Sequence, residues 1–324
     1  METPDEWCAL SRTAAVERDA LAVPAAGTVL ALAPTGFVSR IGNRSVLVVA
    51  GTEVAAEFAF IYDARIIAAV ATADYLFTCD ITGSVVCSGL DTAFPPIATD
   101  AADDALQPVA PDTFAVTIIP HPTKPVAVFV TEQQALWLDF AAGTAAPLSL
   151  PHGSVSVFDA GGQLLVFDAV AGTRATAVGG KFSCSTAPMP AAIVFTVPPD
   201  VGAWKLAYLF GLHVAIIAER AVLFYDLVYM HLISIIYIKD PSDITATSKG
   251  LVVATMLGDL VSVYVDQETS TLVTIPAVFL HPCTNYTANS VIRGVGDDIL
   301  VFAFNTRRVY RVSAAAADDD FVVV

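Results

Sequence analysis

Basic residues are scarce in this chain of 324 residues. There are 16 lysines and arginines against 32 aspartates and glutamates, and the formal net charge is −16. Nonspecific binding to nucleic acid needs dense Lys and Arg against phosphate, so this charge balance argues against direct contact with RNA or DNA. The same negative charge keeps an apolar-rich chain in solution and disfavours adsorption to anionic membranes.

Residues and motifs that carry chemistry are also few. The chain has five histidines and contains no GxSxG, HExxH, P-loop or GxGxxG pattern. His121 and His281 precede prolines, which predicts turn positions, whereas His213 and His231 lie in apolar runs, where a hydrogen-bonded core histidine is the expectation. A catalytic triad is spatial rather than sequential, and nothing in the spacing favours one. We therefore predict a protein without catalytic residues, cofactor, metal site or small-molecule substrate.

The five cysteines show neither CxxC nor metal-ligand spacing, and an odd count suits a reducing compartment. Cys79 and Cys87 are predicted to face each other across a hairpin centred on Gly83. A disulfide between them is geometrically possible, and two buried thiols are the favoured alternative. The acidic N-terminal stretch lacks an apolar leader run, so we expect an intracellular protein, cytoplasmic or nuclear.

No apolar stretch is long enough and sufficiently free of charge to span a membrane, although hydrophobic residues make up 55% of the chain. The longest candidate, 206–238, contains Glu219, Arg220, Asp226 and His231, so it holds no uncharged window of about 20 residues. Successive buried strands account for it better than a membrane helix does.

Short apolar runs separated by turn residues are the main pattern that is present. Residues 115–143 (AVTIIPHPTKPVAVFVTEQQALWLDFAAG) read as three strands joined by a Pro-rich turn and a polar turn, and the remaining chain resembles looser copies of this unit. The predicted strands are 28–33, 36–41, 45–50 and 53–60; 65–71, 74–79, 84–88 and 95–98; 113–119, 126–131, 134–140 and 146–150; 154–158, 163–168 and 173–178; 203–209, 212–218, 221–226 and 231–238; 243–247, 250–255, 259–265 and 270–275; and 289–293, 298–304 and 307–313.

These strands repeat with a period. The second strands of successive units begin about 44 residues apart on average, from Phe37 to Ile299, which lies in the range for four-stranded propeller blades. Radial sheets also hide edges that one open sheet of this size would expose. We therefore predict an all-β, seven-bladed β-propeller with four-stranded antiparallel blades, with six blades as the alternative.

Several segments resemble parts of a WD40 repeat. Residues 33–36 (APTG) and 118–122 (IIPHP) resemble the end of its first strand, 223–227 (LFYDL) the strand end that gives the family its name, and 80–85 (DITGSV) and 258–261 (GDLV) its central hairpin. Gly-His and Trp-Asp dipeptides are absent, so the family's buried His–Asp network is absent or replaced. The chain thus resembles a degenerate WD40-like propeller over residues 28–313.

Three segments follow from this interpretation. Residues 1–26 form an N-terminal arm, 27–313 the propeller, and 314–324 an acidic tail or a closing outer strand. The last outer strand is supplied either by 321–324 or by the N-terminal arm. The acidic runs 100–104 and 318–320 are interpreted as a solvated loop and tail, and docking to a basic partner is the alternative.

Four arginines are the candidate site residues. Arg44, Arg65, Arg307 and Arg308 fall in turns that are predicted to emerge on one face, in units that ring closure makes neighbours. Guanidinium groups pair well with carboxylate or phosphate, which would suit an anionic partner. The alternative is ordinary exposed turn charge balanced by acidic neighbours such as Asp63.

The resemblance implies a noncatalytic scaffold that mediates protein–protein interactions within a multi-subunit complex, because propellers offer a broad rigid surface with specificity in their loops. One alternative is a noncatalytic subunit of an RNA- or DNA-modifying or chromatin complex. A propeller hydrolase or lactonase is the third reading.

Overall fold

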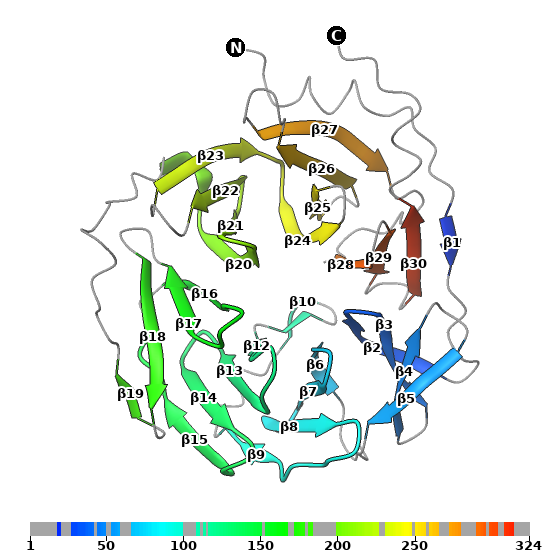
Figure 1. Cartoon of the computed structure of the whole chain (residues 1–324), viewed down its shortest axis with the longest axis vertical. Coiled ribbons are helices and arrows are strands. Elements are labelled where there is room, and N and C mark those ends of the chain that lie inside the picture. The colour runs from blue at the N-terminus through cyan, green and yellow to red at the C-terminus, as the bar shows by residue number, and fades with distance from the viewer. Residues whose placement is uncertain are drawn as a thin grey trace. The chain divides into compact units, whose positions relative to one another are not determined.

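The computed structural model of this chain is built from antiparallel β-strands (Figure 1). It describes residues 18–20, 27–41, 44–49, 53–58, 66–99, 108–110, 113–114, 116–150, 153–167, 172–178, 181–183, 199–226, 231–247, 250–256, 259–265, 272–279, 290–295, 298–303 and 308–313. The chain forms two compact units. We call Ala22–Val194 the N-terminal unit, and Met1–Leu21 with Phe195–Val324 the C-terminal unit.

The described part of the N-terminal unit contains four sheets of four strands, each a simple antiparallel meander. The sheets are β2 (Gly27–Ala33), β3 (Gly36–Ile41), β4 (Arg44–Val49) and β5 (Glu53–Phe58); β6 (Ile66–Ala71), β7 (Tyr75–Asp80), β8 (Ser84–Gly89) and β9 (Ile97–Ala98); β12 (Thr117–Pro120), β13 (Val126–Val130), β14 (Ala135–Asp139) and β15 (Thr144–Pro147); and β16 (Val155–Phe158), β17 (Leu164–Phe167), β18 (Gly172–Val178) and β19 (Lys181–Ser183). A separate hairpin pairs β10 (Pro108–Ala110) with β11 (Thr113–Phe114).

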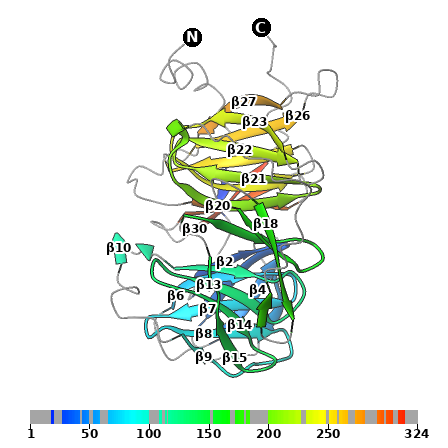
Figure 2. The ribbon, with the colours of Figure 1, turned by 90° about the vertical axis from the view of Figure 1, so that its left-hand side faces the viewer.

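The described part of the C-terminal unit contains three sheets of four strands and a short 3-10 helix, Pro199–Val201. Figure 2 shows β20 to β23 in succession. The sheets are β20 (Trp204–Phe210), β21 (His213–Ala218), β22 (Ala221–Asp226) and β23 (His231–Tyr237); β24 (Pro241–Thr247), β25 (Gly250–Thr255), β26 (Asp259–Val265) and β27 (Leu272–Phe279); and β28 (Ser290–Val295), β29 (Asp298–Ala303), β30 (Arg308–Ser313) and β1 (Arg18–Ala20).

The strand at the outside of the last sheet comes from the start of the chain. β1 pairs antiparallel with β30, with Arg18 opposite Val312 and Ala20 opposite Tyr310. The sequence left two alternatives for this outer strand, the N-terminal arm and 321–324. β1 belongs to the arm, and 321–324 lies outside the described residues.

Two strand predictions need correction. The predicted strand 113–119 is divided: Thr113 and Phe114 form β11, which pairs with β10, and β12 begins only at Thr117. β19, which pairs with β18, was not predicted at all. Both pieces are two or three residues long, too short for alternation of apolar and polar residues to identify them.

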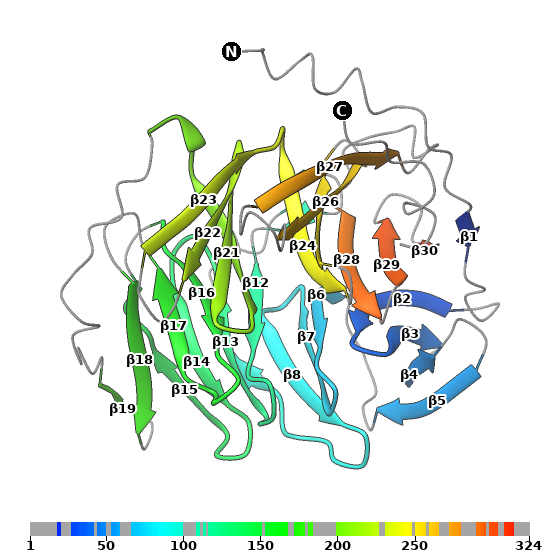
Figure 3. The same cartoon turned by 45° about the horizontal axis from the view of Figure 1, so that its top comes forward.

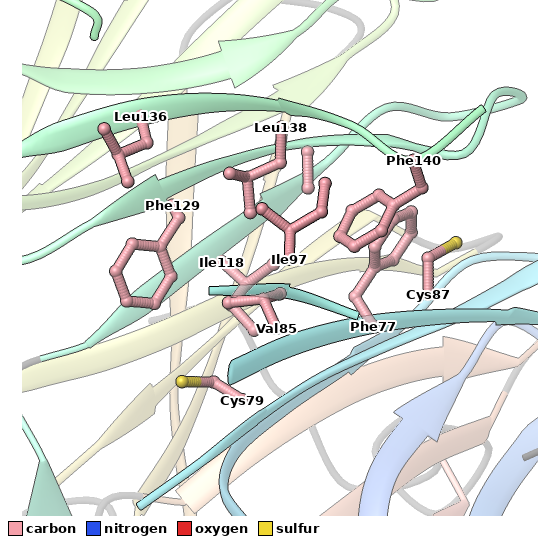
Figure 4. Close-up of a cluster of buried hydrophobic side chains, with 11 residues drawn as sticks. Phe77, Cys79, Val85, Cys87, Ile97, Ile118, Phe129, Leu136, Leu138 and Phe140 are labelled. Carbon is pink, nitrogen blue, oxygen red and sulfur yellow. The ribbon is translucent and has the colours of Figure 1, made fainter. Parts of the chain in front are cut away.

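A cluster of apolar side chains joins the second and third sheets of the N-terminal unit (Figure 4). Phe77 and Phe140 pack with ring centroids 5.8 Å apart, and Leu138 is buried beside them. The buried Cys79 and Cys87 belong to the same cluster and are free thiols. Burial raises the pKa of each thiol to about 12, and the charge of Asp80 adds to the effect on Cys79.

The two cysteines are not directly opposite each other, so that prediction was wrong. Cys79 faces Val85, and Cys87 faces Phe77. The turn explains this register: the Asp80 carboxylate accepts hydrogen bonds from the backbone N–H groups of Thr82 (2.8 Å) and Ser84 (3.1 Å). Gly83 adopts a φ of 78°, which favours glycine. The aspartate therefore sets a hairpin centred on Thr82 instead of Gly83, and the partner of Cys79 moves by two residues, from Cys87 to Val85.

His121 lies in a turn after β12, as predicted, and it is also buried. Its ring packs 5.1 Å from that of Phe158 in the neighbouring sheet, and Phe158 packs 5.6 Å from Trp137. Its Nδ1 accepts a hydrogen bond from the backbone N–H of Thr123 (3.2 Å). Desolvation is the main cause that lowers the pKa of His121, so a neutral imidazole fills this space between two sheets.

Polar side chains connect the first strands of successive sheets in the C-terminal unit, where β24 lies beside β28 (Figure 3). A first strand is the edge of its sheet, and its outward backbone groups need partners. The Tyr208 hydroxyl on β20 accepts from the N–H of Ala246 on β24 (3.0 Å). Asp243 and Thr245 on β24 accept from the N–H groups of Ile292 (2.8 Å) and Gly294 (2.7 Å) on β28.

Asp243 makes stability depend on pH. Burial raises the pKa of its carboxyl from 3.8 to about 6, against the opposing effects of its two backbone hydrogen bonds and of Arg293. Because the folded protein keeps this proton where the unfolded chain has released it, the contribution is full below pH 3.8 and is lost as the pH rises through about 6. We expect the wild type to lose up to about 3 kcal/mol more unfolding free energy than Asp243→Asn between pH 3.5 and 7.

The measurement is urea unfolding of both proteins across this pH range. The difference between the two curves isolates Asp243 from the other carboxylates, which titrate in both. Asparagine offers only one side-chain oxygen to the two N–H groups. This loss changes the unfolding free energy of Asp243→Asn by the same amount at every pH, so it does not alter the pH dependence. Parallel curves would show that Asp243 titrates as an ordinary exposed carboxylate does.

Candidate interaction surface

The first strands of the C-terminal sheets run in the same direction. Along β24 and β28, Asp243 bonds to Ile292 and Thr245 to Gly294, so the numbering rises together on both strands. The same holds for β20 and β24, where the Lys205 ammonium donates to the carbonyl of Pro241 (3.2 Å) and Tyr208 contacts Ala246. Because each sheet is an antiparallel meander, the turns that join second to third strands lie at one common end of this unit.

Exposed side chains lie at that end, among them Glu219 and the four that follow. Arg220 is in the turn between β21 and β22, Tyr237 ends β23, Lys239 follows it, and Met256 follows β25. Tyr237 is 53% exposed and Met256 37%, whereas most apolar side chains of these sheets are buried. We call Arg220, Tyr237, Lys239 and Met256 the turn surface.

Backbone hydrogen bonds hold the segments that carry the turn surface. The N–H of Arg220 donates to the carbonyl of Val201 (3.0 Å), and the N–H of Ile238 donates to the carbonyl of Arg220 (3.1 Å). The N–H of Met256 donates to the carbonyl of Asp240 (2.8 Å). Asp240 adopts a φ of 49°, a left-handed conformation that aspartate tolerates better than most residues. These bonds position the exposed side chains on ordered backbone.

Tyr237 is also held through its hydroxyl, which donates to the Asp200 carboxylate (3.1 Å). Desolvation raises the pKa of this phenol, and the hydrogen bond and charge of Asp200 raise it further. The tyrosine is therefore neutral and donates a hydrogen bond at physiological pH. Its ring offers apolar area beside a satisfied polar group, a combination that is favoured at protein interfaces.

The sequence did not identify the turn surface. Tyr237 lies in the run 232–238 (LISIIYI), which is apolar except for Ser234 and predicts burial. It is on the outermost strand of its sheet, however, and 53% of its surface remains exposed. Met256 is in the turn segment 256–258 (MLG), where local composition does not decide exposure. The available signal was the position of both residues next to turns that the strand pattern had placed correctly.

The predicted arginine sites are only partly described. Arg44 is the first residue of β4 and pairs with Ile41. Arg308 is the first residue of β30 and pairs with Ala303. Both begin a third strand directly after a turn instead of lying in the turn itself. Arg65 and Arg307 lie outside the described residues, and the shared arginine sector remains a prediction.

The opposite end of the C-terminal unit carries one exposed apolar residue, Leu212 (64%), in the two-residue turn between β20 and β21. Gly211 precedes it with a φ of 59°, as expected for such a hairpin turn. His213 follows and stacks on Phe210 with centroids 5.5 Å apart. Its side chain is 41% exposed, with Nε2 3.9 Å from the Asp226 carboxylate. The prediction of a core histidine is therefore wrong for His213, because the residue begins its strand. His231 likewise begins β23, and His281 lies outside the described residues.

A search of the described residues for metal sites finds no group of three or more His, Cys, Asp or Glu side chains that is able to hold an ion. In the same part of the chain, no helix is long and apolar enough to cross a membrane.

Comparison with known proteins gives a likeness of structure alone. No protein-family model matches the sequence, and no curated protein matches it. Among solved structures, the RRP9 WD40 repeats superpose with a TM-score of 0.61 at 7% identity, over 94% of this chain and 98% of that one. Hsv2 of the yeast Kluyveromyces marxianus gives 0.59 at 10% identity, over 88% and 92%. Sqt1 of Saccharomyces cerevisiae gives 0.56 at 13% identity, over 97% and 89%.

These likenesses and the repeated four-stranded meanders define the fold as an all-β propeller. The fold is similar to that of solved WD40 repeats, the resemblance that residues such as 80–85 and 223–227 indicated. At identities of 7% to 13%, the likeness carries the fold and not the activity of any of these proteins.

Proposed function

We propose that this protein is a noncatalytic, seven-bladed WD40-like scaffold that binds other proteins within a multi-subunit complex. On this proposal the blades are the four described sheets of the N-terminal unit and the three of the C-terminal unit. On this proposal residues 27–313 form the ring, 1–26 an arm whose β1 completes the last sheet, and 314–324 an acidic tail. The buried free thiols of Cys79 and Cys87 suit a reducing intracellular compartment.

The turn surface is the observation that carries the proposal. Tyr, Met and Arg are enriched at protein interfaces, and the residues that dominate binding energy are often Tyr and Arg. Arg220, Tyr237 and Met256 expose these side chains at one end of one unit. Their backbone is already ordered, which lowers the entropy lost on binding.

The four arginines predicted from sequence extend this proposal. Arg44, Arg65, Arg307 and Arg308 follow or occupy turns that join second to third strands or successive units. In a closed ring such turns share one face. Arg220 and Met256 also lie at turns of the second-to-third-strand kind. We propose that the partner presents carboxylates to these guanidinium groups.

Comparative affinity purification tests the scaffold role. The full chain and the double variant Arg220→Ala/Met256→Ala are each used to capture partners from the source cells, followed by quantitative mass spectrometry. We expect at least one stoichiometric partner of the wild type to fall about tenfold or more in the variant, because two central contacts of about 1 kcal/mol or more are lost. Both substitutions keep the backbone hydrogen bonds of residues 220 and 256.

A matched control replaces the exposed Leu212, which lies at the opposite end of the C-terminal unit, with alanine. Arg307→Glu/Arg308→Glu is a third arm that tests the arginine extension separately. Equal capture by the wild type and the turn-surface variant would reject this surface as the binding site. If the partner is lost at high salt and the captured complex contains RNA or DNA, the alternative function is favoured, that of a noncatalytic subunit of an RNA- or DNA-modifying or chromatin complex.

A further inference from the structure

Strand β23 is an unprotected outer edge. Proteins protect the outer strands of their sheets with charge, proline or short length, because unpaired N–H and C=O groups are able to bind another strand. β23 (HLISIIY) has seven residues with no lysine, arginine, aspartate, glutamate or proline. No other strand among the described residues pairs with its outer side.

The other described outer strands follow the protective rule. Each is either charged, interrupted by proline or only two residues long. They are β5 with Glu53 and Glu57, β9 with two residues, β15 with Pro147, β19 with Lys181, β27 with Pro276, and β1 with Arg18 and Asp19. β23 is thus the exception among the described outer strands, and its edge lacks these protective features.

The hydrogen-bond register identifies the backbone groups that face outward. Ile238 donates its N–H to Arg220 across the strand pair (3.1 Å). Along two antiparallel strands, hydrogen-bonded residue pairs alternate with non-hydrogen-bonded pairs. The backbone N–H and C=O groups of Ile236 and Ser234 therefore also face β22. The N–H and C=O groups of Ile235 and Tyr237 therefore point away from the sheet. A bulge at Ile233, between the pairs that Ser234 and Leu232 make, adds a 41% exposed side chain to this edge.

We propose that the outer edge of β23 binds an extended, basic segment of a partner protein as an added β-strand. Main-chain hydrogen bonds to Ile235 and Tyr237 would supply affinity, and alternate apolar side chains would pack beside Ile233 and Tyr237. The net charge of −16 favours a segment rich in Lys or Arg, and opposes a second copy of this acidic chain at the same edge. The inference rests on the proposed scaffold function and names a further binding site for it, which adjoins the turn surface at Tyr237.

A fluorescent ten-residue peptide of alternating valine and lysine is the probe, and its anisotropy with the full chain is measured at moderate salt. The decisive pair of variants is Tyr237→Pro and Tyr237→Val. Both lose the ring and the bond to Asp200, but only proline removes the outward N–H, at an edge position that tolerates it. We expect the dissociation constant of the peptide from Tyr237→Val to lie within about threefold of the wild-type value. For Tyr237→Pro we expect it to be higher by about tenfold or more.

A second peptide with N-methyl groups on alternate backbone nitrogens keeps the charge and side chains but loses strand pairing. It is expected to bind the wild type about tenfold more weakly than the parent peptide, and this comparison needs no variant to fold. Equal binding of the two peptides, or of the two Tyr237 variants, would overturn the proposal. So would a wild-type dimer in sedimentation that Tyr237→Pro abolishes, because the occupant would then be a second copy.

The outcome is separable from the proposed function. Arg220→Ala/Met256→Ala leaves the β23 edge intact, so it is expected to bind the peptide as the wild type does. Lost peptide binding in that variant, with Tyr237→Pro unaffected, would place the peptide on the turn surface and overturn the edge proposal.

Discussion

Gly294→Ala is expected to destabilise the C-terminal unit by about 3 kcal/mol or more. Gly294 lies on β28, and a methyl group there would overlap the carbonyl oxygen of Ala246 on β24 and lie 2.8 Å from its carbonyl carbon. The obstacle is backbone, which cannot turn aside as a flexible side chain does. Separating β24 from β28 would also weaken the bond from the Gly294 N–H to Thr245 (2.7 Å).

Thermal and urea unfolding of the full chain measure this effect, with hydrogen exchange to show that the C-terminal unit opens first. Gly89→Ala is the matched control. Gly89 also lies in a strand, but its added methyl group would have ordinary contacts of 3.4 Å or longer. We expect the control to change the unfolding free energy by about 1 kcal/mol or less. A Gly294→Ala protein as stable as the control would mean that β24 and β28 are not in this close contact.

Gly162→Ala is expected to destabilise the N-terminal unit by about 3 kcal/mol, from two causes. Gly162 adopts a φ of 77°, which strains any residue with a side chain. Its added methyl group would also overlap Nε2 of the buried His121 and lie 2.6 Å from Cε1. The imidazole has little room to move, because it packs against Phe158 at 5.1 Å.

Gly153→Ala separates these causes. Gly153 has a similar φ of 73°, but no atom lies within 4 Å of its added methyl group, so only the backbone strain of about 1 to 2 kcal/mol is expected. The destabilisation by Gly162→Ala beyond this backbone strain is expected to decrease when His121 is also changed to alanine. A double-mutant cycle of the two substitutions should then give a coupling energy of about 1 kcal/mol or more. Additive effects of the two substitutions would show that the histidine is not the obstacle.

Strand positions were largely readable from the sequence. β21 and β22 were predicted at 212–218 and 221–226, and the structure has them at His213–Ala218 and Ala221–Asp226. Apolar runs of strand length between turn residues depend on neighbours along the chain, so local composition suffices to place them. The same regularity, repeated at about 44 residues, predicts a propeller from the sequence alone.

Contacts between distant segments were beyond that approach. β1 has three residues, and nothing local marks Arg18–Ala20 as the partner of β30, almost three hundred positions later. The register of Cys79 against Val85 depends on three hydrogen bonds to the Asp80 carboxylate, two from backbone N–H groups and one from the Thr82 hydroxyl. The exposure of Tyr237 depends on its place on the last strand of a sheet, which an apolar run does not reveal.

By itself the sequence determined the all-β class, the repeat and most strand boundaries, because turn chemistry and apolar periodicity act over a few residues. Only the tertiary structure decided that β23 is the outer strand of its sheet, which glycines touch a neighbouring sheet, and that His121 is buried while His213 is not. Those properties arise from packing between sheets, where residues some forty positions apart come into contact, and a pattern read along one strand carries no record of what lies against it.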